Sequence, residues 1–523
     1  MDNWIERNHL YSFNDGSSNF SISFAGMNFT ANDLANMADK FARATREMKQ
    51  IENGAIKNPD EKRKVTHFSD RLTYPKSQLF AEVNKFASQV RNGEITAPDG
   101  KKFEAVVVNG IGGSALGPQL MQFAVNGPYW NELSVEKRHN GLKIYFLDNT
   151  DSSGIADLIQ VMNPAVTLVL TISKSGGTQE TKNNLISLEN YYAAQKVDFG
   201  KCAVAITMKG SELDKHATAN NWLANFEMAD SIGGRTSESS IVGHVPAVLT
   251  GIDFGAFLAG ASHMDEITRN ADAEKNPAAM LSAMWYIAGN GKGDRNMVIV
   301  PYSDRLILMS RYLQQLVMES LGKEYDLDGK VVHQGLNVFG NKGGTDAHAF
   351  IQQLNDGRDD FFATFIEVLK DSMKLPISGN IGMGDYLHGF QEGLSSALRS
   401  RKRQIITIKI SEVTPYNLGM LIALYERAVA MYAEYININA FHQPGVQAYK
   451  LAAKSILALR ENLIAKLEVA APISGTAAEI AGKIGLPESE IEIAGLLDKA
   501  AFNCCCTKRE LNADGNWVYS ITK

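Results

Sequence analysis

Short runs of apolar, largely β-branched residues alternate with helical patterns along the middle of the chain. Four of these runs predict buried strands, at Ala105–Val108, Lys143–Leu147, Leu168–Ile172 and Ala203–Thr207. Segments with helical spacing separate them, for example at Gly154–Val161 and Gly177–Ala194. This alternation is typical of a parallel sheet with helices on both faces.

The same alternation returns after a helical stretch near residues 245–290. Three further strands are expected at Met297–Pro301, Ala363–Leu369 and Ile405–Ile410, and two helices at Asp304–Ser320 and Pro415–Ala433. The pattern therefore predicts a second α/β domain. In open α/β sheets ligands bind beyond the carboxyl ends of the strands, so we expect a site in the crevice between the two domains.

The two ends of the chain differ from this region. Residues 1–95 have a mainly helical, polar pattern and are interpreted as an N-terminal arm; we place the two α/β domains at 96–275 and 276–451, and an extension at 452–523. In the extension, two helical patterns at Ala477–Ile484 and Ile491–Phe502 precede a strand at Trp517–Ile521, which is typical of a winged helix. From residue 470 on it is poor in Lys and Arg and rich in Asp and Glu, so a structural or interface role is favoured over DNA binding.

Composition narrows the function classes. The chain has 523 residues and a net charge of −6, which argues against a nucleic-acid-binding protein. It has no apolar stretch of about 18 residues and no basic segment followed by an apolar one at its start, so a cytoplasmic protein without a membrane span is expected. The four cysteines, Cys202 and Cys504–Cys506, fit neither a disulfide framework nor zinc spacing, and we expect reduced, partly buried thiols.

A glycine-rich stretch, Gly110–Pro118, follows the first apolar run and leads into a helix. Its backbone can approach a ligand closely, and N–H groups at a helix start attract anions. No Gly-Lys-Ser/Thr follows, and Ala115 stands at the third glycine position of the dinucleotide fingerprint, so neither common nucleotide motif is present. Ser114 suits the phosphate of a small molecule.

A second stretch, Ser173–Thr181, repeats this arrangement after the third apolar run. Ser173, Ser175 and Thr178 supply hydroxyl groups, and two adjacent glycines free the backbone. Hydroxyls and N–H groups around a helix start can hold a phosphate without a metal ion. Either loop alone could be an ordinary strand-to-helix turn, but two such loops in one sheet favour phosphate binding.

Further candidate residues lie later in the chain. Gln315 and Glu319 are four apart on a predicted helix, so a base and a merely solvated helix face are both open interpretations. Arg235 follows two glycines, which suits an anionic oxygen, and His348 follows a Gly-rich turn. A Pro-Gly turn stands between Gln443 and Lys450.

Together these stretches, in this order, resemble the glucose-6-phosphate isomerase family over residues 105 to 450. The motifs that carry the resemblance are GIGGSALGP, SKSGGTQET, GGR, MES-x-GK, a Gly-rich stretch ending in HAF, and QPGV-x-x-x-K. The resemblance implies two SIS-type α/β sandwich domains, an aldose–ketose isomerase without cofactor or metal, and a homodimer whose catalytic histidine crosses the interface.

The resemblance also implies roles for individual residues. Glu319 would be the base that moves a proton between C1 and C2, Arg235 would stabilise the enediolate, and His348 and Lys450 would assist ring opening. The residues implied for substrate binding are Gly113, Ser114, Ser173, Ser175, Thr178, Gln315 and Gln443. Such a set is sufficient for the chemistry without a metal.

Some positions depart from the family pattern and keep alternatives open. The second loop lacks an aromatic residue and a second Thr common in animal members, and Glu238 stands where many members carry an apolar residue. Sugar preference is therefore open. A bifunctional glucose/mannose-6-phosphate isomerase and a non-catalytic SIS sugar-phosphate sensor are the alternatives.

Overall fold

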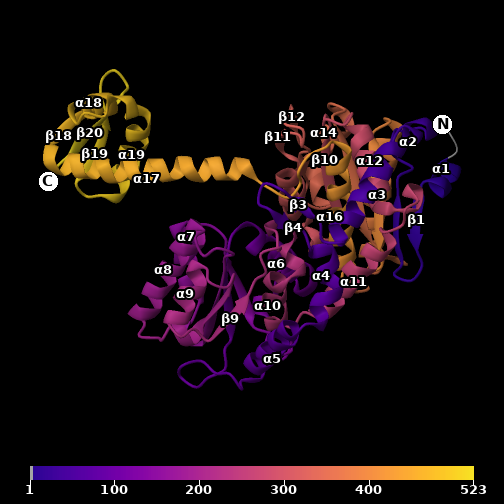
Figure 1. Cartoon of the computed structure of the whole chain (residues 1–523), viewed down its shortest axis with the longest axis horizontal. Helices are drawn as coiled ribbons and strands as arrows, with labels where there is room; N and C mark the ends of the chain where they lie inside the picture. The colour runs from indigo at the N-terminus through magenta and orange to yellow at the C-terminus, as the bar shows by residue number, and fades with distance from the viewer. Residues whose placement is uncertain (1–3) are drawn as a thin grey trace. The chain divides into compact units, whose positions relative to one another are not determined.

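The structure, a computed structural model, describes residues 4–523 and, at Gln447, the backbone alone (Figure 1). Two compact units follow one another along the chain, and the boundary lies between His442 and Gln443. The first unit contains two separate sheets with their helices, and the second contains the C-terminal extension. No helix among the described residues is both long and apolar enough to cross a bilayer.

The first sheet has five parallel strands in the order β6-β5-β7-β8-β9. Its strands are β5 (Ala105–Asn109), β6 (Lys143–Leu147), β7 (Thr167–Ile172), β8 (Ala203–Thr207) and β9 (Ala224–Glu227). All residues of β5, β7 and β8 are buried, because helices cover both faces. The four strands predicted in this region are confirmed; β9, with a single buried residue, was not predicted.

Six helices accompany this sheet. They are α5 (Gln78–Asn92), α6 (Leu116–Asn126), α7 (Ser152–Val161), α8 (Gln179–Ala194), α9 (Glu212–Ala219) and α10 (Ile241–Leu249). Helix α7 packs on β6, α8 on β5 and β7, and α9 on β8, while α10 contacts β5, α5 and α6.

The second sheet has six strands in the order β1-β2-β17-β14-β10-β13. Its strands are β1 (Ser12–Asp15), β2 (Phe20–Ser23), β10 (Asn296–Tyr302), β13 (Val338–Phe339), β14 (Phe361–Val368) and β17 (Gln404–Ile410). The last four run parallel, whereas β2 pairs antiparallel with β17 and with β1. The prediction of a second α/β sandwich built on a parallel sheet is confirmed.

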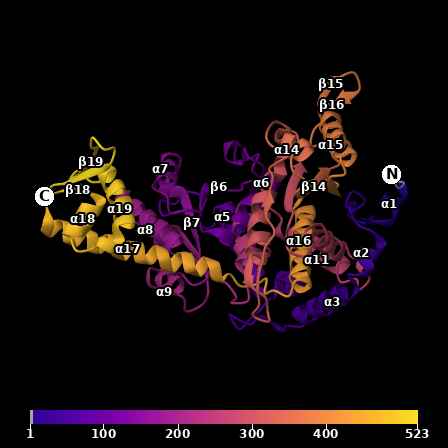
Figure 2. The ribbon, with the colours of Figure 1, turned by 90° about the horizontal axis from the view of Figure 1, so that it is seen from above.

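The core of this half is a long central helix, α16 (Pro415–Tyr435), which is buried from Asn417 onward. It packs against α11 (Phe254–Ile267), α12 (Pro277–Ala288) and α3 (Ala38–Glu52). Helices α11 and α3 can be followed beside it in Figures 1 and 2, and α12 in Figure 1. The remaining helices around this sheet are α1 (Trp4–Leu10), α2 (Ala31–Ala35), α4 (His67–Thr73), α13 (Met309–Leu313), α14 (Ile351–Asp356) and α15 (Met383–Ser400).

Three small strand pairs lie outside the two sheets. They are β3 (Ile56–Asn58) with β4 (Arg63–Lys64), β11 (Lys323–Tyr325) with β12 (Val331–Gln334), and β15 (Pro376–Ser378) with β16 (Ile381–Gly382). The β15–β16 hairpin stands out from the rest of the first unit (Figure 2). Residues 4–95 thus contain four short strands beside their helices, and two of these strands extend the second sheet.

The second unit has a small core of its own. Its elements are α17 (Pro444–Ala470), β18 (Ile473–Thr476), α18 (Ala477–Lys483), α19 (Glu490–Asn503), β19 (Thr507–Leu511) and β20 (Trp517–Ile521). The antiparallel sheet has the order β18-β20-β19, and Ile480, Ile493 and Tyr519 are buried between it and the helices. The cysteines are free, but Cys504 and Cys505 are exposed, so partial burial was wrong for these two.

Candidate active site

Both glycine-rich loops leave the carboxyl ends of neighbouring parallel strands. The first runs from β5 through the turn Gly112–Ser114 into α6, and the second runs from β7 into α8. Because β5 and β7 pair directly, the two loops emerge side by side at one edge of the sheet. Ligands of open α/β sheets bind at this edge.

The hydroxyl groups of the second loop lie around the start of α8. Ser173 is buried, and its Oγ accepts a hydrogen bond from the N–H of Gly176 at 3.1 Å and lies 3.3 Å from Oγ1 of Thr178. Ser175 is exposed. Gly176 has a φ of +76°, and a Cβ there would collide with the backbone of α9, so glycine is required. The loop can therefore surround an anion with hydroxyls and backbone N–H groups.

The first loop packs backbone against backbone on the turn that carries Arg235. A Cβ atom at Gly113 would lie 1.6 Å from the carbonyl oxygen of Gly234, so only glycine fits. Ser237, in the same turn as Arg235, donates to the carbonyl of Gly113 at 2.9 Å. Ser114 follows at the end of the loop and is half-buried.

Arg235 is held by several carbonyl and hydroxyl groups and points toward Glu319. It belongs to the turn Gly234–Ser239, is 7% exposed, and donates to Oγ of Ser320 at 2.9 Å and to the carbonyls of Ala440 and His442. Its Nε lies 3.8 Å from Oε2 of Glu319. Burial lowers the pKa of the Arg235 guanidinium, and the Glu319 carboxylate opposes that shift. The result is a fixed cation beside a carboxylate.

The predicted helix Asp304–Ser320 is wrong as a single α-helix. A 3₁₀ turn (Asp304–Leu306) and α13 lead into a π-helical segment, Gln314–Glu319. Such segments are rare and occur frequently at functional sites. This one ends on Glu319, whose side chain is 21% exposed and thus accessible to a substrate. A Cβ at Gly112 would lie 3.1 Å from Nε2 of Gln315, so this amide faces the first loop.

Sequence reasoning gave no role to a buried lysine next to this pair. Lys323, the last residue of the MES-x-GK motif, is 5% exposed, and its Nζ donates to the carbonyl of Glu319 at 2.7 Å. Burial, and then the charge of Arg235, lower the pKa of Lys323 to about 7. Its place in the motif was the signal that could have identified it.

Two further cations hold the loop that leads to Arg235. Lys174, from the second glycine-rich loop, and Arg63, from β4, both donate to the carbonyls of Asp230 and Ile232. At Ile232 the distances are 3.2 Å for Lys174 and 3.0 Å for Arg63. These hydrogen bonds connect the second glycine-rich loop to the segment that leads into the Arg235 turn. The sequence around Arg63 has no pattern that predicts its contact.

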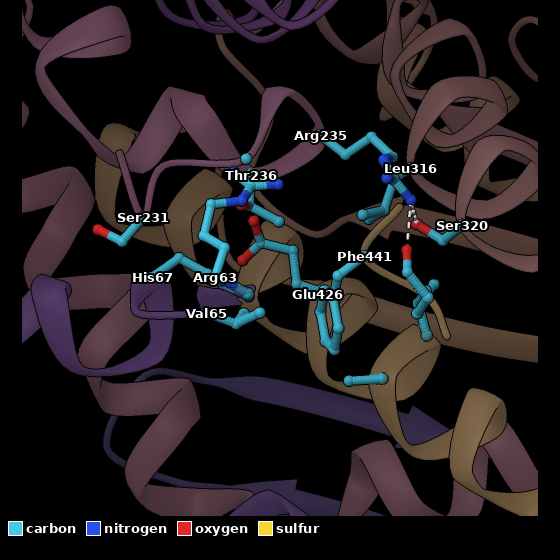
Figure 3. Close-up of a pocket in the computed structure, with 14 residues that line it drawn as sticks. Arg63, Val65, His67, Ser231, Arg235, Thr236, Leu316, Ser320, Glu426 and Phe441 are labelled. Carbon is cyan, nitrogen blue, oxygen red and sulfur yellow. Dashed lines mark hydrogen bonds between the residues drawn. The ribbon is translucent and has the colours of Figure 1, made fainter. Parts of the chain in front are cut away.

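A small cavity of about 30 Å³ adjoins Arg235 (Figure 3). Arg63, Ser231, Thr236, Glu426 and Phe441 are among the residues that line it. A space of this size holds about one water molecule. It is therefore too small for a sugar phosphate, and the open face of Glu319 is the better candidate for the substrate.

His348 lines a cavity other than the one beside Arg235. It is exposed at the end of the turn Thr345–His348 and lines a mainly apolar cavity of about 340 Å³ with Tyr302, Phe390 and Leu394. Neither Arg235 nor Glu319 lines that cavity.

Gln443 and Lys450 belong to the second unit. Gln443 directly precedes α17, and Lys450 lies two turns into that helix; both are exposed. Their predicted roles stay predictions.

One group of described side chains has the composition of a metal site. Glu367, His388 and Glu392 place ligand-type atoms within 4.8 Å of one another. The buried Glu367, however, is already paired with Lys409 and with His388, at 2.7 Å each. These pairs account for its charge without an ion.

The chain is similar to known isomerases over most of its length. The sequence model of the family described as "Phosphoglucose isomerase" matches residues 32–386 and 395–472. A glucose-6-phosphate isomerase of Nostoc punctiforme is 47% identical over 88% of each chain, and one of Geobacter sulfurreducens is 44% identical over 95% of each chain.

A solved structure agrees with these sequence matches. The crystal structure of a glucose-6-phosphate isomerase from Chlamydia trachomatis superposes with a TM-score of 0.76 at 25% identity, covering 87% of this chain and 91% of the other. The parallel strands of both sheets, the two glycine-rich loops and the Arg235–Glu319 pair all lie within the residues that match the family model. The chain belongs to the phosphoglucose isomerase family.

Proposed function

We propose that the protein interconverts glucose 6-phosphate and fructose 6-phosphate. The observation that carries the proposal is the Arg235–Glu319 pair, with 3.8 Å between Nε and Oε2, next to two loops suited to a phosphate. The proposed substrates are taken from the relatives, which are named glucose-6-phosphate isomerase. These names do not favour a bifunctional mannose enzyme or a sensor.

The pair fits the proton transfer that this reaction needs. In the open-chain sugar, Glu319 takes the proton from C2 of the aldose and returns it to C1, while the hydroxyl proton on the C2 oxygen passes to the C1 oxygen. The reverse reaction uses the same path. The enediolate that forms between the two steps carries negative charge on oxygen. The buried guanidinium of Arg235 stabilises that charge without having to reorganise.

The phosphate is bound at the other end of the substrate. Ser173, Ser175 and Thr178 donate to it around the start of α8, and Gly113 with Ser114 lines the site. These contacts persist in ground state and transition state alike, so they position the sugar and lower KM. Gln315 and Gln443 orient the sugar hydroxyls.

Ring opening precedes proton transfer, and His348 and Lys450 assist it in this proposal. In this proposal His348 comes from a second copy of the chain. Exposed apolar residues gather along the segment from the end of β14 through β15 and β16 into α15, and Phe390 of this segment lines the cavity with His348, which supports a homodimer. These residues are Leu369, Met373, Leu375, Ile377, Ile381, Met383, Tyr386 and Phe390. Exposed apolar patches of this kind mark interfaces, and the projecting β15–β16 hairpin forms part of this segment (Figure 2).

Mixed variants test the shared site. Glu319→Gln and His348→Asn should each be inactive, but on subunit exchange a hybrid dimer contains one intact site with Glu319 and His348 from different chains. At equal amounts, roughly a quarter of all sites then regain activity. No recovery after proven exchange would contradict a histidine shared across the interface.

A coupled assay of fructose 6-phosphate conversion to glucose 6-phosphate tests the reaction itself. We expect turnover by the wild type and a loss of several orders of magnitude in Glu319→Gln, which keeps the size of the side chain but cannot accept a proton. Exchange of the C2 hydrogen with deuterium from solvent should fall in parallel. Wild-type exchange and turnover in Glu319→Gln would refute the assignment of the base. In the cell we place the reaction in glycolysis and gluconeogenesis, in the cytoplasm.

A further inference from the structure

We propose that Glu238 and Tyr312 form a buried positioning pair that sets the catalytic base against the arginine and the first phosphate loop. The inference rests on the proposed function and adds two residues to it. Neither residue touches the proposed substrate space. Their role is to hold three separate segments of the site in register.

The contact between the two residues is direct and shielded from water. The hydroxyl of Tyr312 donates to Oε1 of Glu238 at 2.9 Å, and the two residues are 2% and 1% exposed. Glu238 lies three residues after Arg235 in the same turn, and Tyr312 lies in α13, directly before the π-helical segment that ends on Glu319. The hydrogen bond therefore joins the turn of the arginine to the helix of the base.

The first phosphate loop meets the same carboxyl group. A Cβ at Gly117, in the first turn of α6, would collide with the side chain of Glu238 and would lie 3.3 Å from its Oε2. On the other side, a Cβ at Gly243 would collide with the carbonyl of Glu238. Gly117 thus leaves room for the side chain of Glu238, and Gly243 leaves room for its backbone, where α6 and α10 meet the Arg235 turn.

Two side chains act on the carboxyl group of Glu238. Tyr312 acts through its hydrogen bond, and Arg71 of α4 acts through its charge. Arg71 is itself paired with Asp265 at 2.8 Å and with Glu426. Burial raises the pKa of Glu238 to about 7. Without the hydroxyl of Tyr312, a buried carboxyl would lose its donor, and its segment would shift toward another partner. A shift of about 1 Å at a reacting group can cost about 100-fold in rate.

Single and double variants test the pair. Tyr312→Phe should lower kcat at least roughly tenfold while KM changes less than about threefold, because base and arginine lose register, whereas the hydroxyls of the second phosphate loop, which the pair does not hold, still bind the phosphate. Glu238→Gln keeps an acceptor oxygen for Tyr312 and should stay close to wild type. Glu238→Leu should resemble Tyr312→Phe, and the double variant Glu238→Leu/Tyr312→Phe should lose less than the product of the singles, since no buried polar group is left unpaired.

Tyr192→Phe is the matched control. Its hydroxyl also makes a buried hydrogen bond of 2.9 Å, to the carbonyl of Thr167 at the opposite end of β7. It should lower the melting temperature about as much as Tyr312→Phe and leave kcat within twofold of wild type. Amide hydrogen exchange of residues 314–319 should accelerate in Tyr312→Phe alone, a readout that does not need turnover.

The outcomes separate this inference from the proposed function. A wild type without isomerase activity would refute the function, while the exchange measurement would still decide the positioning role. An active wild type together with unchanged kcat and unchanged exchange in Tyr312→Phe would overturn the inference. So would a rise in KM alone, or a loss of kcat that only follows the fraction of unfolded protein.

Discussion

Gly113→Ala should inactivate the enzyme through a backbone collision rather than through any lost side chain. The new Cβ would lie 1.6 Å from the carbonyl oxygen of Gly234, whereas a relaxed contact needs about 3.5 Å. Loop and turn must therefore separate by about 2 Å. This also breaks the hydrogen bond from Ser237 to Gly113, now 2.9 Å. The displaced turn carries Arg235, so we expect kcat/KM to fall by about 100-fold or more.

The coupled isomerase assay, with melting temperature measured in parallel, checks this. Gly154→Ala in α7 is the control, because no atom lies within 4 Å of its Cβ position and a helical alanine stabilises the helix by about 0.5 to 1 kcal/mol. It should keep full activity. If Gly113→Ala folded and stayed within threefold of wild type in kcat/KM, the backbone contact between the two segments would not exist in solution.

Three more measurements address the phosphate, the metal and the buried lysine. Ser173→Ala/Thr178→Ala should raise KM for the sugar phosphate far more than it lowers kcat, and an unchanged KM would refute the phosphate site. Activity should survive EDTA, since a carboxylate and a guanidinium suffice for the chemistry; a loss that added metal reverses would contradict this. The lowered pKa of Lys323 means that the folded chain holds one proton fewer than the unfolded chain above about pH 7, so stability rises with pH between about 7 and 10. Between pH 7.5 and 9.5 the free energy of unfolding of the wild type should rise by about 2 kcal/mol, and that of Lys323→Met should not show this rise. The same pH dependence in both proteins would contradict a lowered pKa of Lys323.

The features that sequence predicted correctly depend on local patterns. Short apolar runs of β-branched residues such as Val106–Val108 are typical of strands buried on both faces, and glycines directly after them mark the loops at the sheet edge. β9 was missed because a short edge strand with one buried residue carries no such pattern. The π-helical segment was missed because its apolar residues also fit the spacing of an α-helix.

Long-range pairing explains the other omissions. Arg63 acts on the carbonyls of Asp230 and Ile232, far away in sequence, and nothing near it in the chain indicates this. The hydrogen bond between Glu238 and Tyr312 is of the same kind. The motifs identify which residues carry chemistry, whereas the contacts that hold those residues in place arise only in the folded chain.

The antiparallel pair β1–β2 at the edge of the second sheet has a consequence for biosynthesis. β2 pairs with β17, with Ser23 opposite Thr407. On the ribosome β2 therefore waits for about 380 residues, roughly 20 to 80 s at usual synthesis rates, before its partner strand emerges. During that interval one edge of β2 has unpaired backbone N–H and C=O groups, and the apolar side chains of Phe20 and Ile22 are not yet buried. Such a strand can pair with other chains. Protection of the nascent N-terminal segment by a chaperone should therefore raise the yield of folded protein.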